Sequence, residues 1–91
     1  MARRLTRQTL GPKFTEGHRR VWAAAERDGL TPQDVGARLG LAKGSETKFL
    51  YGERGASRHV AKAANEEFGV PDWCWDVAPK RPFVPPAARA A

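Results

Sequence analysis

Cysteine is nearly absent from this sequence, because Cys74 is the single one among 91 residues. One thiol cannot form an intramolecular disulfide or supply a cysteine-based zinc site, so secreted disulfide scaffolds and zinc fingers are excluded. Long apolar runs are missing as well. No stretch approaches the roughly 20 residues of a membrane-spanning helix, and no signal-peptide core follows the basic start at Arg3 and Arg4. We therefore expect a cytoplasmic protein with no membrane partner.

The side chains that carry catalysis or hold metals do not occur in useful sets. His18 and His59 are far apart and have no cysteine, histidine or carboxylate at ligand spacing, so no metal site is expected. Cys74 lies between two tryptophans with no histidine nearby, which indicates a packed thiol rather than a nucleophile. The chain also lacks a glycine-rich phosphate loop and a paired-carboxylate motif. These absences predict a protein that is not an enzyme and uses no cofactor.

Positive charge is present, and it is concentrated at the start of the chain. The formal net charge is +6, and residues 1–20 hold six basic residues against one acidic residue, Glu16. A basic segment attracts a polyanion over about a Debye length, which favours nucleic acid or an anionic surface as a partner. Charge alone also fits a protein that is merely soluble, so the pattern of helices has to decide between these interpretations.

The length allows one domain, and the apolar spacing predicts an all-α fold, a compact bundle of four to five short helices over residues 15–77. Residues 1–14, with Gly11 and Pro12, are expected to form a flexible basic arm that Phe14 can fix to the body. Residues 78–91 are expected to form a proline-rich tail that is extended or disordered. The expected helices span residues 15–28, 32–39, 43–51 and 58–68, with a final helical turn at 72–77.

Local signals place the helix ends. Thr31 before Pro32 is a strong start for the second helix, and Ser57 is the expected cap of the fourth. Glycines follow the last periodic residue of each helix, as helix ends require. Gly36 is unexpected inside the second helix, where it costs roughly 0.5 to 1 kcal/mol relative to alanine. Its presence predicts that another helix approaches the backbone closely at this point.

Three segments, taken in order, resemble the lambda-repressor-like helix-turn-helix family (Cro-type, xenobiotic response element) over residues 21–75. GLTPQDVGARLGL is similar to the family's Gly-Leu-Thr-Gln opening, with Ala or Gly in the middle of the second helix. FLYGERGAS is similar to its helix-ending glycine, basic loop and serine cap, and FGVPDWCW to the exit of its fourth helix. The resemblance implies a bacterial or phage DNA-binding protein whose third helix enters a major groove.

The sequence departs from the family pattern at two positions. Ala42 stands where a serine or threonine cap is usual, and Glu46 stands where the third helix normally buries valine or isoleucine. A buried, unpaired carboxylate is costly. Glu46 therefore needs a basic partner, or the third helix is shifted in register.

The resemblance also implies which side chains would contact DNA. Lysine can donate to guanine O6 and N7, and hydroxyls can pair with several base edges. Free amides at the start of the second helix suit a phosphate, and basic N-terminal arms can lie along a duplex or enter a minor groove. The expected base contacts are Lys43, Gly44, Ser45, Thr47 and Lys48; the phosphate contacts are Thr31, Gln33, Arg54 and Arg58; the arm contacts are Arg3, Arg4 and Arg7.

The favoured hypothesis is a sequence-specific regulator of transcription, a repressor of bacterial or phage type, that binds double-stranded DNA as a homodimer. A symmetric dimer is expected because one recognition helix covers too few base pairs. The alternative is a protein-interaction module, or an antitoxin-like protein, that uses the tryptophan turn and the tail KRPFVPPAA to bind a protein partner. An RNA-binding function is less favoured, since an exposed aromatic platform for single strands is not evident.

Overall fold

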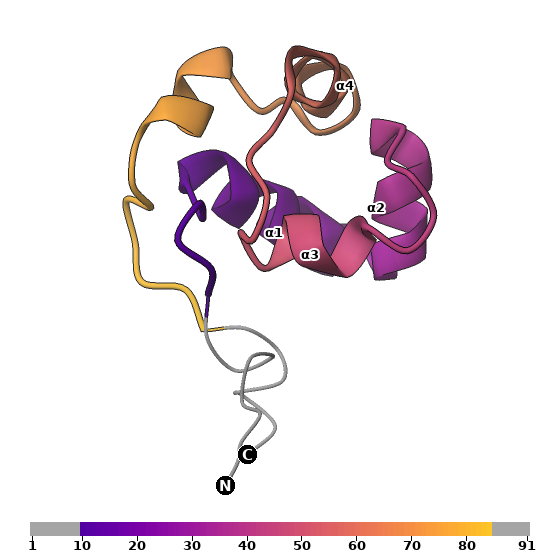
Figure 1. Ribbon diagram of the computed structural model, residues 1–91, viewed down its shortest axis with the longest axis horizontal. Helices are drawn as coiled ribbons and strands as arrows, with labels where there is room; N and C mark the ends of the chain where they lie inside the picture. The colour runs from indigo at the N-terminus through magenta and orange to yellow at the C-terminus, as the bar shows by residue number, and fades with distance from the viewer. Residues whose placement is uncertain (1–9, 85–91) are drawn as a thin grey trace, which may run out of the picture.

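The structure is a computed structural model that describes residues 10–84 (Figure 1), and helices provide the regular secondary structure of this part of the chain. The all-α expectation is thereby confirmed. None of the helices between residues 10 and 84 has the length and apolar character that crossing a bilayer requires. The elements are α1 (Glu16–Asp28), α2 (Pro32–Leu39), α3 (Glu46–Leu50), α4 (Arg58–Phe68) and the 3₁₀ helix η2 (Asp72–Asp76).

The helix ends that were predicted from local signals are confirmed in three of the four α-helices. The Thr31 hydroxyl accepts from the Asp34 N–H at the start of α2, and the Ser57 hydroxyl accepts from the Val60 N–H at the start of α4. Gly29, Gly40 and Gly69 follow α1, α2 and α4 with φ of 67°, 73° and 69°. This left-handed conformation stops a helix and costs glycine little, which is why these helices end where the sequence says.

One hydrophobic core joins all five elements. Val21 of α1, Val35 and Leu39 of α2, and Ala64 of α4 have no exposed surface. The Trp22 indole N–H donates to the Leu50 carbonyl at 2.6 Å, which ties the middle of α1 to the end of α3. Further core residues are Phe49, Val60, Val70 and the completely buried Cys74, whose packed thiol agrees with the sequence interpretation.

Where the structure describes the expected arm and tail, at residues 10–14 and 78–84, both segments lie against the helical body. Gly11 N–H donates to the Tyr51 carbonyl at 2.6 Å, and Lys13 N–H donates to the Gly52 carbonyl at 2.9 Å. Phe14 is buried and stacks on Phe83, with ring centroids 5.5 Å apart. Figure 1 shows the two flanking segments converging at one end of the molecule. The packed body therefore extends beyond residues 15–77 on both sides, because two aromatic rings far apart in sequence cover each other.

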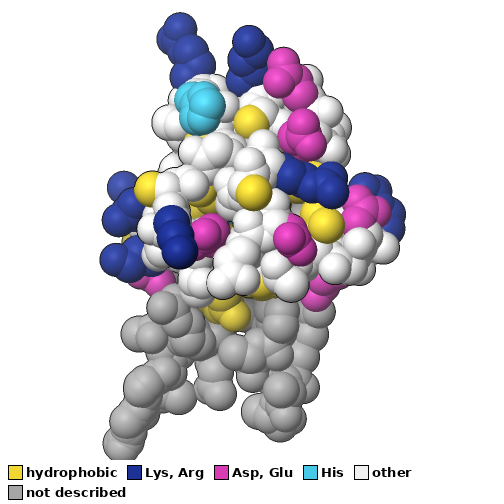
Figure 2. All heavy atoms as spheres, turned by 90° about the vertical axis from the view of Figure 1, so that its right-hand side faces the viewer, with side chains coloured by type: hydrophobic (Ala, Val, Ile, Leu, Met, Phe, Trp, Pro, Cys, Tyr) yellow, Lys and Arg dark blue, Asp and Glu magenta, His cyan; other side chains and the backbone are white. Residues whose placement is uncertain are grey.

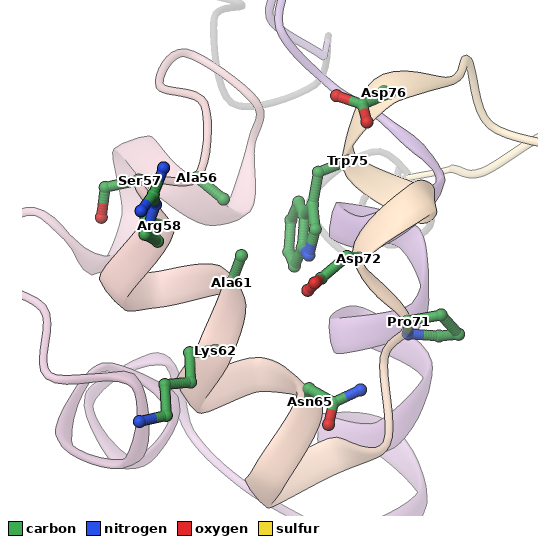
Figure 3. Close-up of a pocket in the computed structure, with 10 residues that line it drawn as sticks. All are labelled: Ala56, Ser57, Arg58, Ala61, Lys62, Asn65, Pro71, Asp72, Trp75 and Asp76. Carbon is green, nitrogen blue, oxygen red and sulfur yellow. The ribbon is translucent and has the colours of Figure 1, made fainter.

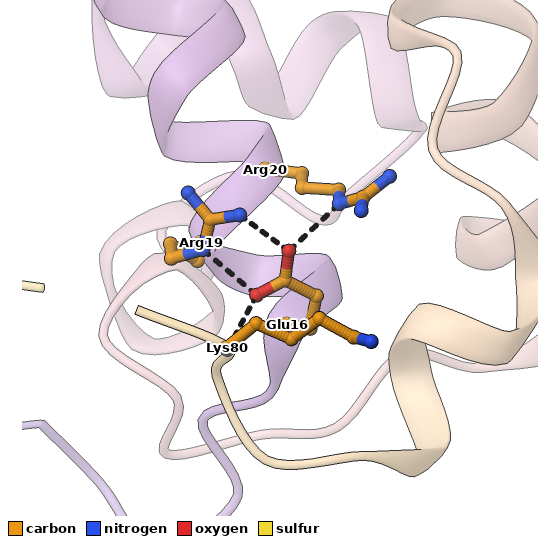
Figure 4. A network of polar contacts seen from close by, with 4 residues as sticks. All are labelled: Glu16, Arg19, Arg20 and Lys80. Carbon is orange, nitrogen blue, oxygen red and sulfur yellow. Dashed lines mark hydrogen bonds and ion pairs between the residues drawn. The ribbon is translucent and has the colours of Figure 1, made fainter. Parts of the chain in front are cut away.

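Glu16 fixes the C-terminal segment to the start of α1 (Figure 4). Its carboxylate has no exposed surface and makes an ion pair with both Arg19 and Arg20. It also accepts from the Lys80 backbone N–H at 2.8 Å, while the Glu16 N–H donates to the Val77 carbonyl at 3.0 Å. Hydrogen bonds from Arg19 are the largest of the effects that lower the pKa of Glu16 to about 2. An acidic residue in a basic segment thus becomes the centre of a buried polar network.

His18 is also completely buried, among the rings of Phe14, Phe49 and Trp75. Its Nδ1 accepts from the Thr15 N–H at 3.0 Å, so the neutral ring carries its proton on Nε2 and donates to the Arg54 carbonyl at 2.9 Å. Burial lowers the pKa of His18 to about 4. The ring therefore serves as a neutral bridge inside the core.

Gly36 gives the close approach that its position in the sequence predicted. A methyl group at Gly36 would overlap the Cγ atom of Glu46, the first residue of α3. The start of α3 therefore lies directly on the backbone of α2. This contact sets the separation of the two helices.

Substitution of Gly36 tests this crossing. We expect Gly36→Ala to lower the free energy of unfolding by up to about 2 kcal/mol, because overpacking costs about 1–3 kcal/mol and alanine regains about 1 kcal/mol of helix propensity. Urea unfolding measures the change. Gly55→Ala is the matched control, since nothing lies within 4 Å of a methyl group there. The loss should shrink in a Glu46→Ala background, and an equal loss in both backgrounds would contradict the contact.

The two buried titrating groups predict a stepwise loss of stability in acid. Below pH 6.5 the unfolded chain protonates His18 and the folded chain does not, so stability falls between about pH 6.5 and 4, by roughly 3 kcal/mol in all. Protonation of Glu16, which is easier in the unfolded chain, then lowers the stability further as the pH falls from about 4.5 toward 2. Urea midpoints between pH 8 and 3 measure both steps. The variant His18→Phe should lose the first step alone, and an unchanged profile would contradict the assignment.

Candidate nucleic-acid interface

The segment between α2 and α3 is a tight turn held by short-range hydrogen bonds. Gly40 ends α2, and the Leu41 N–H donates to the Gly36 carbonyl at 2.9 Å. The Ser45 hydroxyl donates to the Ala42 carbonyl at 2.6 Å, and the Ser45 N–H donates to the same oxygen at 3.0 Å. These bonds fix the direction in which the chain enters α3.

The prediction of a third helix over residues 43–51 was wrong at its start. Gly44 has φ of 91°, and a helix cannot continue through that conformation. Lys43, Gly44 and Ser45 consequently lie in the turn, while Thr47 and Lys48 lie on α3. Three of the five expected base contacts thus lie in the turn before α3, and two lie on α3 itself.

Glu46 explains why α3 begins where it does. Its Oε1 accepts from the Gly44 N–H at 2.9 Å, and its methylene groups lie over Gly36. The side chain is half-buried rather than buried. The expected alternatives were a basic partner or a shifted helix; the carboxylate has a backbone partner and the helix starts later. A side chain that looked misplaced in the sequence stabilises the turn.

Exposure differs among the expected base contacts. The side chains of Lys43 and Lys48 are exposed, as is the backbone of Gly44. Ser45 and Thr47 are half-buried, and the Ser45 proton is already used by the Ala42 carbonyl. The two lysines are therefore the donors most available to a ligand along this edge.

The start of α2 is less suited to a phosphate than the sequence suggested. The Thr31 N–H donates to the Asp34 carboxylate at 3.0 Å, and the Thr31 hydroxyl accepts from the Asp34 N–H. These hydrogen bonds hold the pKa of Asp34 below its usual value, which keeps a negative charge at the helix start. The Thr31 amide is therefore occupied by an internal anion. Gln33 is exposed beside it.

Arg54 and Arg58 lie on either side of the Ser57 cap, and both are exposed. The first turn of α4 carries no acidic residue. A groove of about 260 Å³ lies between this segment and the turn before α3, and Ser45 and Arg54 both line it. The fold thus brings one of the expected base contacts next to one of the expected phosphate contacts.

The charges on the visible surface are mixed. Figure 2 shows basic side chains spread over the face on the α2 and α4 side, with acidic side chains between them. A polyanion that bound to this face would therefore contact separate basic side chains rather than a continuous basic surface. The expected arm contacts Arg3, Arg4 and Arg7 lie outside the described residues.

A second groove, of about 810 Å³, lies between α4 and η2 (Figure 3). Arg58 and Lys62 line it on the α4 side, and Asp72 and Asp76 line it on the η2 side, with the Trp75 ring between the two walls. No group of three or more histidine, cysteine or acidic side chains suited to a metal ion occurs in residues 10–84. This groove is chemically different from the one beside α3, because its walls carry opposite charge.

Sequence reasoning missed one residue of this region, His18. The sequence gives this histidine no partner at metal-ligand spacing and no other role, yet its Nε2–H donates to the Arg54 carbonyl beside the smaller groove. The spacing Thr15-x-x-His18 at the start of a helix was the available signal, since a polar residue at this position can bond back to the cap backbone.

Comparison of the chain with protein-family models, with curated proteins and with solved structures gave no match.

Proposed function

We propose that this protein is a cytoplasmic regulator of bacterial or phage type that binds specific sites on double-stranded DNA as a homodimer. The observation that carries the proposal is the crossing of α2 and α3 at Gly36, beside a turn that presents Lys43 and a helix that presents Lys48. Two short crossed helices joined by a tight turn suit a duplex, because the second can enter the major groove while the first lies across the backbone.

The short α3 changes where base contacts are expected. A helix of five residues is only about 7.5 Å long, so it cannot run along the groove for more than a few base pairs. The proposal therefore assigns base contacts mainly to Lys43, in the turn, and to Lys48. Arg54 and Arg58 lie next to this edge and are assigned to phosphates, with Gln33 as a further polar contact.

The proposal predicts that lysine variants lose sequence preference, whereas arginine variants lose affinity for every duplex. This difference tests it. Sites selected from a random duplex pool supply the specific ligand. Lys43→Ala and Lys48→Ala should lower the preference for selected over random duplex by about tenfold, since a good base contact is worth about 1–3 kcal/mol. Arg54→Ala and Arg58→Ala should weaken both duplexes alike and reduce the slope of log K against log salt by about 1. Fluorescence anisotropy over a range of salt concentrations measures both effects.

Arg27→Ala is the matched control, because it removes one positive charge from the highly exposed end of α1, where Arg27 pairs with Asp28. It should leave the preference and the affinity close to those of the parent chain. Equal losses on selected and random duplex for all four interface variants would refute the assignment of bases to lysine and phosphates to arginine.

A protein-interaction module is the second candidate, and the groove between α4 and η2 favours it. Its facing walls carry unlike charges around the Trp75 ring, which would suit a peptide segment of a partner protein with both acidic and basic residues. Duplex affinity decides between the candidates. A DNA-binding protein should lose affinity steeply between 50 and 200 mM salt, whereas weak binding to every duplex with little salt dependence would favour the module.

A further inference from the structure

The loop between α3 and α4 is connected to the start of α1 by one side chain from a distant part of the sequence. His18 Nε2 lies 2.9 Å from the Arg54 carbonyl oxygen, although the two residues are 36 positions apart. Arg54 itself is an exposed residue, although its carbonyl oxygen is bonded to the completely buried His18 ring. The imidazole therefore fixes the backbone from which the arginine extends.

The hydrogen-bond direction of His18 follows from its other nitrogen. Nδ1 faces the Thr15 backbone N–H at 3.0 Å, and a backbone N–H can only donate. Nδ1 is therefore the acceptor, and Nε2 carries the proton that the Arg54 carbonyl accepts. Both polar atoms of the ring have partners, which is what allows a completely buried imidazole to be stable.

Packing alone does not account for a histidine at this position. Phe14, Phe49 and Trp75 surround the ring, and a phenylalanine would fill an aromatic site of this kind without burying polar atoms. What only a polar ring can do here is reach the Thr15 amide on one side and the Arg54 carbonyl on the other. The second of these contacts leads directly to the proposed DNA interface.

The preceding part of the loop is already fixed by other contacts. The Lys13 N–H donates to the Gly52 carbonyl, and the Glu53 N–H donates to the Lys48 carbonyl, each at 2.9 Å. The next element begins at Ser57, whose hydroxyl caps α4. The hydrogen bond from His18 lies between these two fixed points, at Arg54. Arg54 is the residue whose side chain is assigned to a phosphate.

We infer that His18 is a positioning residue for DNA binding, which holds the Arg54 backbone so that the guanidinium meets a backbone phosphate of the duplex. The inference rests on the proposed function. It assigns His18 no contact with DNA, since the ring is buried. Its effect on affinity passes through Arg54, and this route can be tested apart from its effect on folding.

Two substitutions separate the hydrogen bond from the packing. His18→Gln retains a side-chain N–H that can donate to the Arg54 carbonyl but removes the aromatic ring. His18→Phe retains the ring but removes the donor. We expect His18→Phe to weaken random-duplex binding about threefold to tenfold, on the scale of one lost phosphate contact, and His18→Gln to bind more tightly than His18→Phe. Affinities are measured at pH 7.5 on samples shown to be folded by circular dichroism.

A double-mutant cycle with Arg54→Ala provides the second measurement. Because His18 acts through Arg54, His18→Phe should cause no further loss of duplex affinity once the arginine is gone. An equal loss with and without Arg54, or a His18→Phe variant that binds like the parent chain, would overturn the inference. A ranking in which His18→Gln binds more weakly than His18→Phe would do so too, since it would show that packing alone matters.

The inference can fail separately from the proposed function. If the parent chain binds no duplex with steep salt dependence, the DNA-binding proposal fails and the inference, which rests on it, fails with it. If the parent binds DNA and Arg54→Ala reduces the salt slope while His18→Phe leaves affinity unchanged, the proposal stands and only the positioning role is lost.

Discussion

Three consecutive buried residues at the start of α1, Glu16, Gly17 and His18, hold together parts of the chain that are far apart in sequence. The beginning of a helix has free backbone N–H groups, and burying it is costly unless polar partners are supplied. Here the Glu16 N–H meets the Val77 carbonyl and the Thr15 N–H meets the imidazole. Each of the three residues also contacts a distant part of the chain. Glu16 accepts from the Lys80 N–H, the Trp75 ring packs on Gly17, and His18 donates to the Arg54 carbonyl. The helix start is thus a junction of the N-terminal segment, the α3–α4 loop and the C-terminal segment.

The geometry beside α2 follows a second constraint, which is the absence of a side chain at Gly36. The start of α3 lies on this glycine, and the Glu46 carboxylate turns back to the Gly44 N–H. The turn and the first residue of α3 therefore form one unit, whose shape is set by a small residue and an acidic one. Lys43 and Lys48 extend from this unit on its exposed side.

These two constraints meet at the smaller groove. The turn before α3 forms one side of it, and the segment held by His18 forms the other. Because each side depends on a different contact in the interior, the relative placement of Ser45 and Arg54 reflects how the core is packed. The proposed interface is in this sense a product of buried interactions, although the side chains assigned to DNA are on the surface.

The sequence by itself determined the all-α class and the ends of α1, α2 and α4, because the signals for these are local. Glycine in a left-handed conformation and a hydroxyl that caps the next turn act within a few residues. The tertiary structure decided the late start of α3, the docking of both flanking segments, and the roles of Glu16 and His18. Each of these depends on partners remote in sequence or on the path of the chain between helices. A charged or polar residue gives no sign in the sequence of which distant backbone atom it will meet, and that is why these contacts had to come from the fold.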